Sequence, residues 1–390
     1  MKLLFESIAK RLTEGWRSDE PTGRGQAYRC TCGRPVFFRN SLCLGCKTPL
    51  GYEPDSAQVR ALEPGEIENT LRLAGEKGAG WRRCENFDSP AGCNWLVRVS
   101  DAETLCVSCR LNRTIPNLDD EDNRRWWRVI EVAKRRLVAQ LTGLGLPVKS
   151  KVSEDAERGV MFDFLRSPQD GPAVMTSHGN GLITLNVEEA DDAKREKIRQ
   201  DLHEPYRTLL GHFRHEIGHY YWDRLVAGTP WHEKFRSLFG DERQDYAAAL
   251  KRNYEQGPPA DWRERFISSY ASVHPWEDWA ECWAHYLHVV DSLDTALGFG
   301  VRGEDAEAVV EPFSVEDLYD PSAPDAERVV LLVNSWVKLT TVLNELARSM
   351  GQQDFYPFVM TRSVLRKLHF VQMIVKATCE ESGIEPRIKQ

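Results

Sequence analysis

The stretch Leu209-Leu-Gly-His-Phe-Arg-His-Glu-Ile-Gly-His-Tyr-Tyr-Trp-Asp223 decides the fold of this chain. It lies within a helix predicted over residues 205–226, where Pro205 suits the first turn. His215 and His219 are four residues apart, so both imidazoles lie on one face of that helix and can reach one metal ion. The other faces are apolar and aromatic, which predicts a buried helix whose polar groups need partners.

Glu216 follows the first of these histidines directly. From that neighbouring position its carboxylate can take a proton from a zinc-bound water molecule. One helical turn therefore offers a ligand, a general base and a second ligand. The alternative is a pair of surface histidines with ordinary hydrogen bonds, but the apolar surroundings favour a catalytic zinc site held by His215 and His219.

A catalytic zinc also needs a third protein ligand and an open position for water. We expect that ligand to be Glu277, near the start of a helix predicted over residues 276–297. Glu281 lies one turn later on the same face and is expected to hydrogen-bond a ligand histidine. Asp278 is expected to point elsewhere.

Five further residues near these motifs are weaker candidates. His212 precedes His215 by three residues, and His285 and His288 extend the face that carries Glu281. For all three, an ordinary packing role is the favoured interpretation over ligation. Asp223 is expected to orient a ligand or to cap the helix, and Cys282 to lie in the core, as free cysteines usually do.

Eight of the ten cysteines form two compact groups. The first cysteine cluster comprises Cys30, Cys32, Cys43 and Cys46. The second cysteine cluster comprises Cys84, Cys93, Cys106 and Cys109. Four thiolates match the ligand number of a closed tetrahedral zinc site, so each cluster is predicted to hold one structural zinc ion.

Other interpretations of the cysteines remain open. A disulfide framework needs an oxidising compartment, which no export signal indicates here, while an iron site stays possible. The gaps Cys30 to Cys32 and Cys84 to Cys93 depart from the usual two-residue spacing, so ligands could be shared between clusters, although pairing within each cluster is favoured. Such small modules bury little core, and metal binding should supply most of their folding free energy.

The composition of the chain limits the classes of protein to which it can belong. Hydrophobic residues make up 41% of the 390 residues and aromatic residues 10%, which is enough for a packed core. A net charge of −8 makes nucleic acid an unlikely partner, although residues 1–115 carry 17 basic and 14 acidic residues and hint at an acidic partner for the ribbons. Phe37, Phe38 and Arg39 are interpreted as ribbon core and rim rather than as a base-stacking surface. No apolar run reaches the length of a membrane span, so we expect a cytoplasmic protein without a membrane segment.

The chain is expected to form two regions. Residues 1–115 hold the cysteine modules, at about 28–50 and 80–112, and residues 116–390 form the catalytic domain, after an acidic linker. That domain should be mainly helical, with helices over 124–144, 190–202, 326–350 and 363–381 beside the two given above. Two strands, 159–165 and 181–187, should form a small sheet. The second, around Leu182 to Leu185, is a candidate for pairing with an extended peptide, and an ordinary core strand is an equally favoured interpretation.

The segment Trp276-Glu-Asp-Trp-Ala-Glu-Cys-Trp-Ala284 resembles the third-ligand helix of lethal-factor-type gluzincin metalloproteases. In that family the first glutamate binds zinc, and a tyrosine seven residues earlier stabilises the transition state. The resemblance therefore implies these roles for Glu277 and Tyr270. Asp278 departs from the pattern, because the family often has an aromatic residue there.

The layout of the chain resembles a bacterial family of zinc-ribbon-containing zinc metallopeptidases. The resemblance implies an α+β fold, in which two small four-cysteine zinc-ribbon modules precede a mainly helical, zincin-like metalloprotease domain with a small sheet. It also implies hydrolysis but names no substrate. Together with the metal sites argued above, we expect one catalytic and two structural zinc ions, a peptide or protein substrate, and room for a protein partner of the ribbons. The alternatives are a non-enzymatic zinc-ribbon adaptor that keeps the fold as a scaffold, and a zinc amidase or isopeptidase.

Overall fold

The structure, a computed structural model, describes residues 27–77, 80–168, 170–201, 204, 206–303, 306 and 311–381. Contacts divide them into two compact units. The N-terminal unit holds residues 27–143 and 147–201, and the C-terminal unit holds Leu144–Leu146 and the described residues from 204 onward. The predicted boundary near residue 116 lies inside the N-terminal unit, because the helix and sheet that follow it contact the cysteine-rich part. The mixed helical and strand content confirms the predicted α+β class.

An antiparallel five-stranded sheet, with strand order β3-β4-β5-β6-β7, follows the first cysteine cluster in the chain and carries the second cluster at the ends of β6 and β7. Its strands are β3 (Leu50–Glu53), β4 (Gln58–Pro64), β5 (Leu71–Leu73), β6 (Trp81–Arg83) and β7 (Leu96–Arg98). A small hairpin, β1 (Tyr28–Arg29) and β2 (Pro35–Val36), lies at the first cluster. Leu62, Leu73, Trp81 and Leu96 form a buried core under the sheet. The hairpin also contacts β4, so the sheet and its apolar core connect the two ribbons, which their cysteine spacing alone did not indicate.

A second, four-stranded sheet has the order β10-β11-β9-β8. Its strands are β8 (Asn112–Thr114), β9 (Met161–Leu165), β10 (Ser177–Gly179) and β11 (Leu182–Asn186). Asn180 and Gly181 both have positive φ, as the tight turn between β10 and β11 requires. The expectation that the strand around Leu182 could pair with a peptide is wrong, because β11 is already paired with β10 on one side and with β9 on the other.

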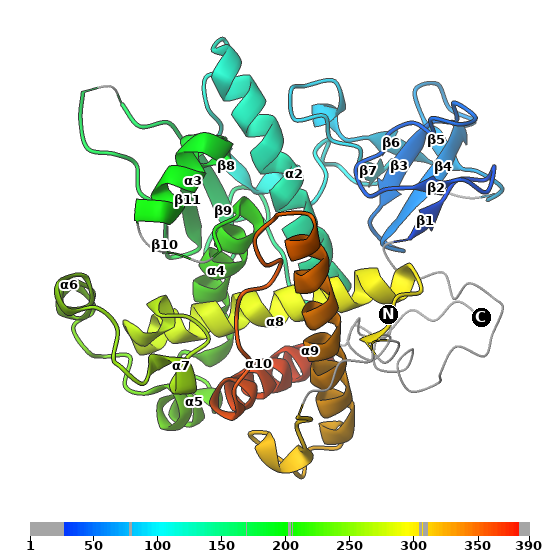
Figure 1. The fold of residues 1–390 in the computed structure, drawn as a ribbon. Coiled ribbons are helices and arrows are strands. Elements are labelled where there is room, and N and C mark those ends of the chain that lie inside the picture. The colour runs from blue at the N-terminus through cyan, green and yellow to red at the C-terminus, as the bar shows by residue number, and fades with distance from the viewer. Residues whose placement is uncertain are drawn as a thin grey trace. The chain divides into compact units, whose positions relative to one another are not determined.

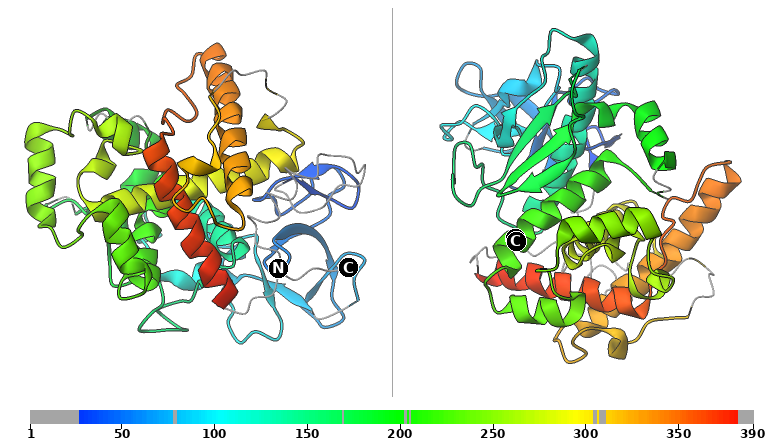
Figure 2. Two further views of the ribbon diagram at one scale, coloured as in Figure 1. Left: turned by 90° about the horizontal axis from the view of Figure 1, so that it is seen from below. Right: turned by 90° about the vertical axis from the view of Figure 1, so that its left-hand side faces the viewer.

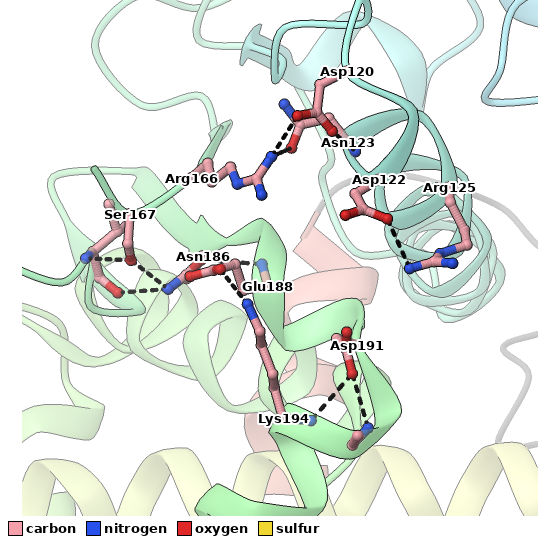
Figure 3. A network of polar contacts seen from close by, with 12 residues as sticks. Asp120, Asp122, Asn123, Arg125, Arg166, Ser167, Asn186, Glu188, Asp191 and Lys194 are labelled. Atoms are coloured by element: carbon pink, nitrogen blue, oxygen red, sulfur yellow. Dashed lines mark hydrogen bonds and ion pairs between the residues drawn. The ribbon is translucent and has the colours of Figure 1, made fainter. Parts of the chain in front are cut away.

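Helix α2 (Glu121–Gly143) packs on this second sheet within the N-terminal unit. Its buried Lys134 donates to Glu131 at 2.7 Å, and Asn112 of β8 donates to the same carboxylate at 2.9 Å. Near the start of α2, Arg166 donates to Asp120 at 2.8 Å and so connects the helix to the segment after β9 (Figure 3). These polar contacts fix α2 against the sheet.

The C-terminal unit is built around α8 (Pro275–Gly298), a long helix in which most residues are buried. It contacts α4 (Leu209–Tyr221), α5 (Trp231–Phe239), α9 (Ala326–Ser349) and α10 (Arg362–Glu381) (Figure 1 and Figure 2). Two further helices, α6 (Tyr246–Gln256) and α7 (Trp262–Arg265), connect α5 to the segment before α8. Helix α4 begins after Thr208, whose hydroxyl accepts a hydrogen bond from the Gly211 amide at 3.0 Å, whereas Pro205 lies outside the described residues.

Gly218 brings α4 and α8 close together. A Cβ atom placed there would lie 3.1 Å from the Ala280 Cα and 3.1 Å from the Trp283 Cβ. The Gly218 carbonyl also accepts a hydrogen bond from the Trp279 indole at 2.9 Å. The glycine inside the His-Glu-x-x-His stretch therefore sets the distance at which the two helices cross.

We expect Gly218→Ala to lower the free energy of unfolding by about 1–3 kcal/mol, because the added methyl group forces α4 away from the α8 backbone. Chemical denaturation of the purified protein would measure the change. Gly143→Ala is the matched control, since a Cβ there meets nothing within 4 Å. Equal stability of the Gly218→Ala variant and the wild type would contradict this account of the crossing.

Helix α9 is long and apolar enough to cross a membrane by length and composition alone. Core helices of soluble proteins pass the same test, and α9 buries Leu332, Val333 and Trp336. Its Asn334 side chain exchanges hydrogen bonds with the Phe313 backbone at 2.9 and 3.0 Å. These contacts suit a packed helix, and the absence of a membrane span stays a prediction.

Candidate functional site

The histidine site consists of His215 and His219 of α4 and Glu277 of α8. The His215 and His219 Nε2 atoms are 3.2 Å apart, and they lie 2.9 and 3.5 Å from the Glu277 Oε2 atom. Ligands about 2.0–2.1 Å from a tetrahedral zinc ion lie about 3.3 Å from one another. The triangle of donor atoms therefore fits a zinc ion, and its side-chain types are those of a catalytic site with three protein ligands.

Glu281 and Ser268 hold the first histidine in place. The Nδ1 atom of His215 lies 2.8 Å from the Glu281 Oε1 atom, and the Ser268 hydroxyl donates to Glu281 Oε2 at 2.6 Å. Burial opposes ionisation of Glu281, but its hydrogen bond to His215 lowers the pKa of Glu281 to about 2. The ionised Glu281 carboxylate accepts a hydrogen bond from the N–H group at Nδ1 of His215. The lone pair on Nε2 of His215 is then available for a metal.

The charges at the site favour a cation between the rings. Burial opposes ionisation of Glu277, yet the neighbouring His219 and His215 lower the pKa of Glu277 well below its ordinary value. Burial likewise opposes protonation of His215, but its contacts with Glu277 and Glu281 raise the pKa of His215 well above its ordinary value. Two carboxylates around two imidazoles thus form a negative pocket in which a metal ion would replace a proton.

Tyr270 and Glu216 lie beside the histidine site. Tyr270 occupies a short 3-10 turn just before α8, and its ring centroid is 5.9 Å from that of His215. Burial and then the charge of Glu277 raise the pKa of Tyr270 well above its ordinary value, so its hydroxyl remains a hydrogen donor. Glu216 is partly exposed and close enough for its charge to act on Tyr270.

The other candidate residues lie in separate surroundings. His285 hydrogen-bonds the Tyr356 hydroxyl at 2.6 Å, and His288 hydrogen-bonds Arg214 at 2.6 Å. Burial lowers the pKa of His285 to about 4, which keeps it neutral. Neither residue belongs to the group of atoms that could hold a metal, as far as the described residues show, and the same is true of His212.

Asp278, Cys282 and Asp223 are not among the three residues whose donor atoms form the histidine site. Asp278 forms a buried ion pair with Lys367 at 2.6 Å and accepts from the buried Cys282 thiol at 3.6 Å. Asp223 lies in the π-helical turn after α4, where burial raises its pKa and the charges of Arg224 and His219 act in the opposite direction.

Two residues that the sequence did not single out contact the site. Ser268 supports Glu281, as described above, and Tyr246 at the start of α6 donates to the Glu277 Oε1 atom at 2.9 Å. Neither residue belongs to a recognisable sequence motif, because each reaches the site through tertiary packing. The sequence offered one indication of Ser268, its position two residues before Tyr270.

The cysteine clusters each bring four sulfur atoms together. Within each cluster the sulfurs all lie within 4.8 Å of one another. In the first cluster, sulfur pairs lie 3.5 Å (Cys30 and Cys46) and 3.8 Å apart (Cys32 and Cys43), and in the second, Cys93 and Cys106 are 3.7 Å apart. Sulfurs about 2.3 Å from a tetrahedral zinc are about 3.8 Å apart, so both clusters fit zinc without exchange of ligands between them. All ten cysteines are free thiols in the structure.

Arg135 of α2 supplies a buried positive charge beside the second cysteine cluster. Its guanidinium donates to the Ala91 carbonyl at 3.1 Å, and only 3% of the residue is exposed. Burial opposes the positive charge of Arg135. The negative charge of Cys93, and after it those of Glu131 and other cysteines of the cluster, nevertheless raises the pKa of Arg135. A zinc ion with four thiolates is an anion overall, so this cation should stabilise it.

We expect Arg135→Gln to weaken zinc binding at the second cluster by about 10–100-fold, the range typical of groups that support metal ligands. Chelator competition on the full chain would show one zinc leaving earlier, while the first cluster serves as an internal reference. Arg125→Gln, on the exposed face of the same helix, should have no effect. Unchanged zinc release from the Arg135→Gln variant would show that the charge is not needed.

The two neighbouring phenylalanines of the first ribbon differ in their burial. Phe38 packs edge-on against Tyr52 and Trp95, with ring centroids 4.9 and 6.4 Å away, so it belongs to the core. Phe37 is 56% exposed. A protein partner for this surface stays a prediction.

Comparison with known proteins finds two family matches, which meet near residue 120. Residues 27–120 match a family described as "zinc-ribbon domain", and residues 123–374 match one described as "Putative zinc-binding metallo-peptidase". Uncharacterized proteins of Mycobacterium bovis and Mycobacterium tuberculosis are 39% identical over 350 residues, which is 89% of this chain and 94% of each relative. No solved structure matches the chain. The chain therefore belongs to this zinc-binding metallo-peptidase family and carries its peptidase region behind a zinc-ribbon domain.

Proposed function

We propose that the protein is a zinc-dependent peptidase of the gluzincin type, which hydrolyses peptide bonds in a peptide or protein substrate. The observation that carries this proposal is the triangle of His215, His219 and Glu277 donor atoms, with sides of 2.9, 3.2 and 3.5 Å. Membership in the metallo-peptidase family supports the same chemistry.

A zinc ion in the histidine site would supply a Lewis acid for the scissile carbonyl and would lower the pKa of a water molecule. Glu216, next to the first ligand, is suited to accept a proton from that water and to return it to the leaving amine. Tyr270 keeps its proton and would donate a hydrogen bond to the oxyanion that forms on the substrate. Glu281 and Ser268 keep His215 in the orientation that these steps need.

The proposal is tested by the metal content of the purified protein together with its activity. Elemental analysis of the wild type should give three zinc ions per chain, and Glu277→Gln should give two, because only the cysteine clusters keep theirs. A peptide-library digest should show cleavage by the wild type and none by the Glu277→Gln variant. Zinc in the cysteine clusters alone would instead favour the non-enzymatic adaptor, and three zinc ions with cleavage of small amides only would favour an amidase.

A further inference from the structure

The two oxygens of the Glu277 carboxylate have different partners. Oε2 faces both histidine rings, at 2.9 Å from His215 and 3.5 Å from His219. Oε1 instead accepts a hydrogen bond from the Tyr246 hydroxyl at 2.9 Å. We propose that Tyr246 is a positioning residue that holds Glu277 so that it offers a single oxygen to the metal, an inference that rests on the proposed function.

His274 ties the segment before Tyr246 to the start of α8. The His274 Nδ1 atom accepts from the Trp276 amide at 3.1 Å and so caps the helix that carries Glu277. With Nδ1 an acceptor, the ring proton is on Nε2, which donates to the Gln244 carbonyl at 3.2 Å. One side chain thus fixes both the N-terminus of α8 and the backbone two residues before Tyr246.

Glu242 ties the same segment to α5. Its carboxylate accepts from Arg236 at 2.6 Å and lies 2.9 Å from the His232 Nε2 atom. The contact with Arg236 lowers the pKa of Glu242 to about 2, so the ion pair persists at neutral pH. The chain between α5 and α6 is therefore anchored at both ends before it reaches Tyr246.

Helix α6 is mostly exposed, and Tyr246 itself is 37% exposed. Ala249 is the buried residue that the structure gives for this helix, while Tyr254, two turns after Tyr246, is 68% exposed. Helix α6 begins at its N-cap Asp245, whose carboxylate accepts a hydrogen bond from the Ala248 amide at 3.0 Å. The cap places Tyr246 at the first helical position, where its hydroxyl interacts with Tyr270 as well as with Glu277.

This arrangement has a consequence for metal binding. A hydrogen bond to the oxygen that does not face the histidines fixes the rotation of the carboxylate and occupies a lone pair that a metal would otherwise attract. Without the hydroxyl, Glu277 is free to tilt or to offer both oxygens, which changes the ligand field and crowds the position that water needs. Tyr246 therefore acts through Glu277 and also supports the orientation of Tyr270.

The test compares Tyr246→Phe with the wild type, and uses Tyr254→Phe as the matched control on the same helix. Zinc is kept in the cysteine clusters and the histidine site is filled with cobalt(II), whose visible spectrum reports ligand geometry. We expect Tyr246→Phe to bind metal about 10–100-fold more weakly at this site and to shift the cobalt bands, while Tyr254→Phe matches the wild type. Circular dichroism establishes that each variant is folded.

The outcomes separate this inference from the proposed function. Wild-type affinity and an unchanged cobalt spectrum in Tyr246→Phe overturn the role of Tyr246 and leave the peptidase proposal standing. A wild-type protein that binds no ion beyond those of the cysteine clusters overturns both. Weaker binding with shifted bands in the Tyr246→Phe variant alone supports the positioning role.

Discussion

Glu216→Gln should retain all bound zinc and lose about 10²–10⁴-fold in kcat/KM, the range that a positioned general base contributes. Glutamine has nearly the same size and keeps hydrogen-bonding capacity, but it cannot accept the proton. Glu216 lies outside the three donor atoms of the histidine site, so removal of its charge should not release the metal. The measurement pairs elemental analysis with initial rates on a peptide cleaved by the wild type.

A matched control separates the base from a general loss of negative charge. Glu233 of α5 has an 82% exposed side chain, and Glu233→Gln should match the wild type in rate and zinc content. A Glu216→Gln variant with a wild-type rate and full zinc would remove Glu216 from the mechanism. Loss of zinc from that variant would show that the carboxylate supports the metal rather than the water.

The longest helices could be predicted from the sequence because their signals are local. The helix expected over 276–297 is α8, Pro275–Gly298, with proline in its first turn and a sustained apolar pattern. The pair His215 and His219 follows directly from helical periodicity. The proximity of Glu277 to these rings depends on tertiary packing. It could be predicted only because the downstream helix resembles the third-ligand helix of a known metalloprotease family.

Features that depend on non-local contacts could not be predicted in this way. Helices α5, α6 and α7 have nine, eleven and four residues, too short for a clear periodic pattern, so Tyr246 was not anticipated. The alternation of apolar residues around Leu182 indicates a strand but does not indicate which strands lie beside it. Because β11 is paired on both sides, it has no free edge for a peptide. The strands that join the two ribbons are also short, and their charged and glycine-rich sequence resembles a linker.

The second cysteine cluster connects elements that lie far apart in the sequence. Cys84 follows β6 and Cys93 precedes β7, so a bound ion closes the connection between two neighbouring strands. Cys109 begins the turn that leads to β8 of the second sheet. All four cysteines are buried, whereas Cys32 and Cys46 of the first cluster are exposed. The second zinc should therefore contribute more to the stability of the N-terminal unit than the first.

Cys93→Ser should lose one zinc ion and much of the order of the five-stranded sheet. Structural zinc supplies about 10–16 kcal/mol of apparent binding free energy in small zinc-finger peptides, and the core of Leu62, Leu73, Trp81 and Leu96 is too small to replace it. Thermal unfolding followed by circular dichroism, with zinc counted in each sample, would measure the loss. Cys46→Ser, at an exposed ligand of the first cluster, should lower the melting temperature less.

Cys379→Ser controls for the chemistry of the substitution itself, because it removes a buried thiol outside both clusters and should keep every zinc ion. A Cys93→Ser variant with full zinc content and the melting temperature of the wild type would mean that the strands hold the ribbon together without the metal. An equal loss in Cys46→Ser would mean that burial of the ligands does not decide how much each zinc stabilises the sheet. Only a larger decrease in melting temperature for Cys93→Ser than for Cys46→Ser agrees with an ion that joins β6, β7 and the turn before β8.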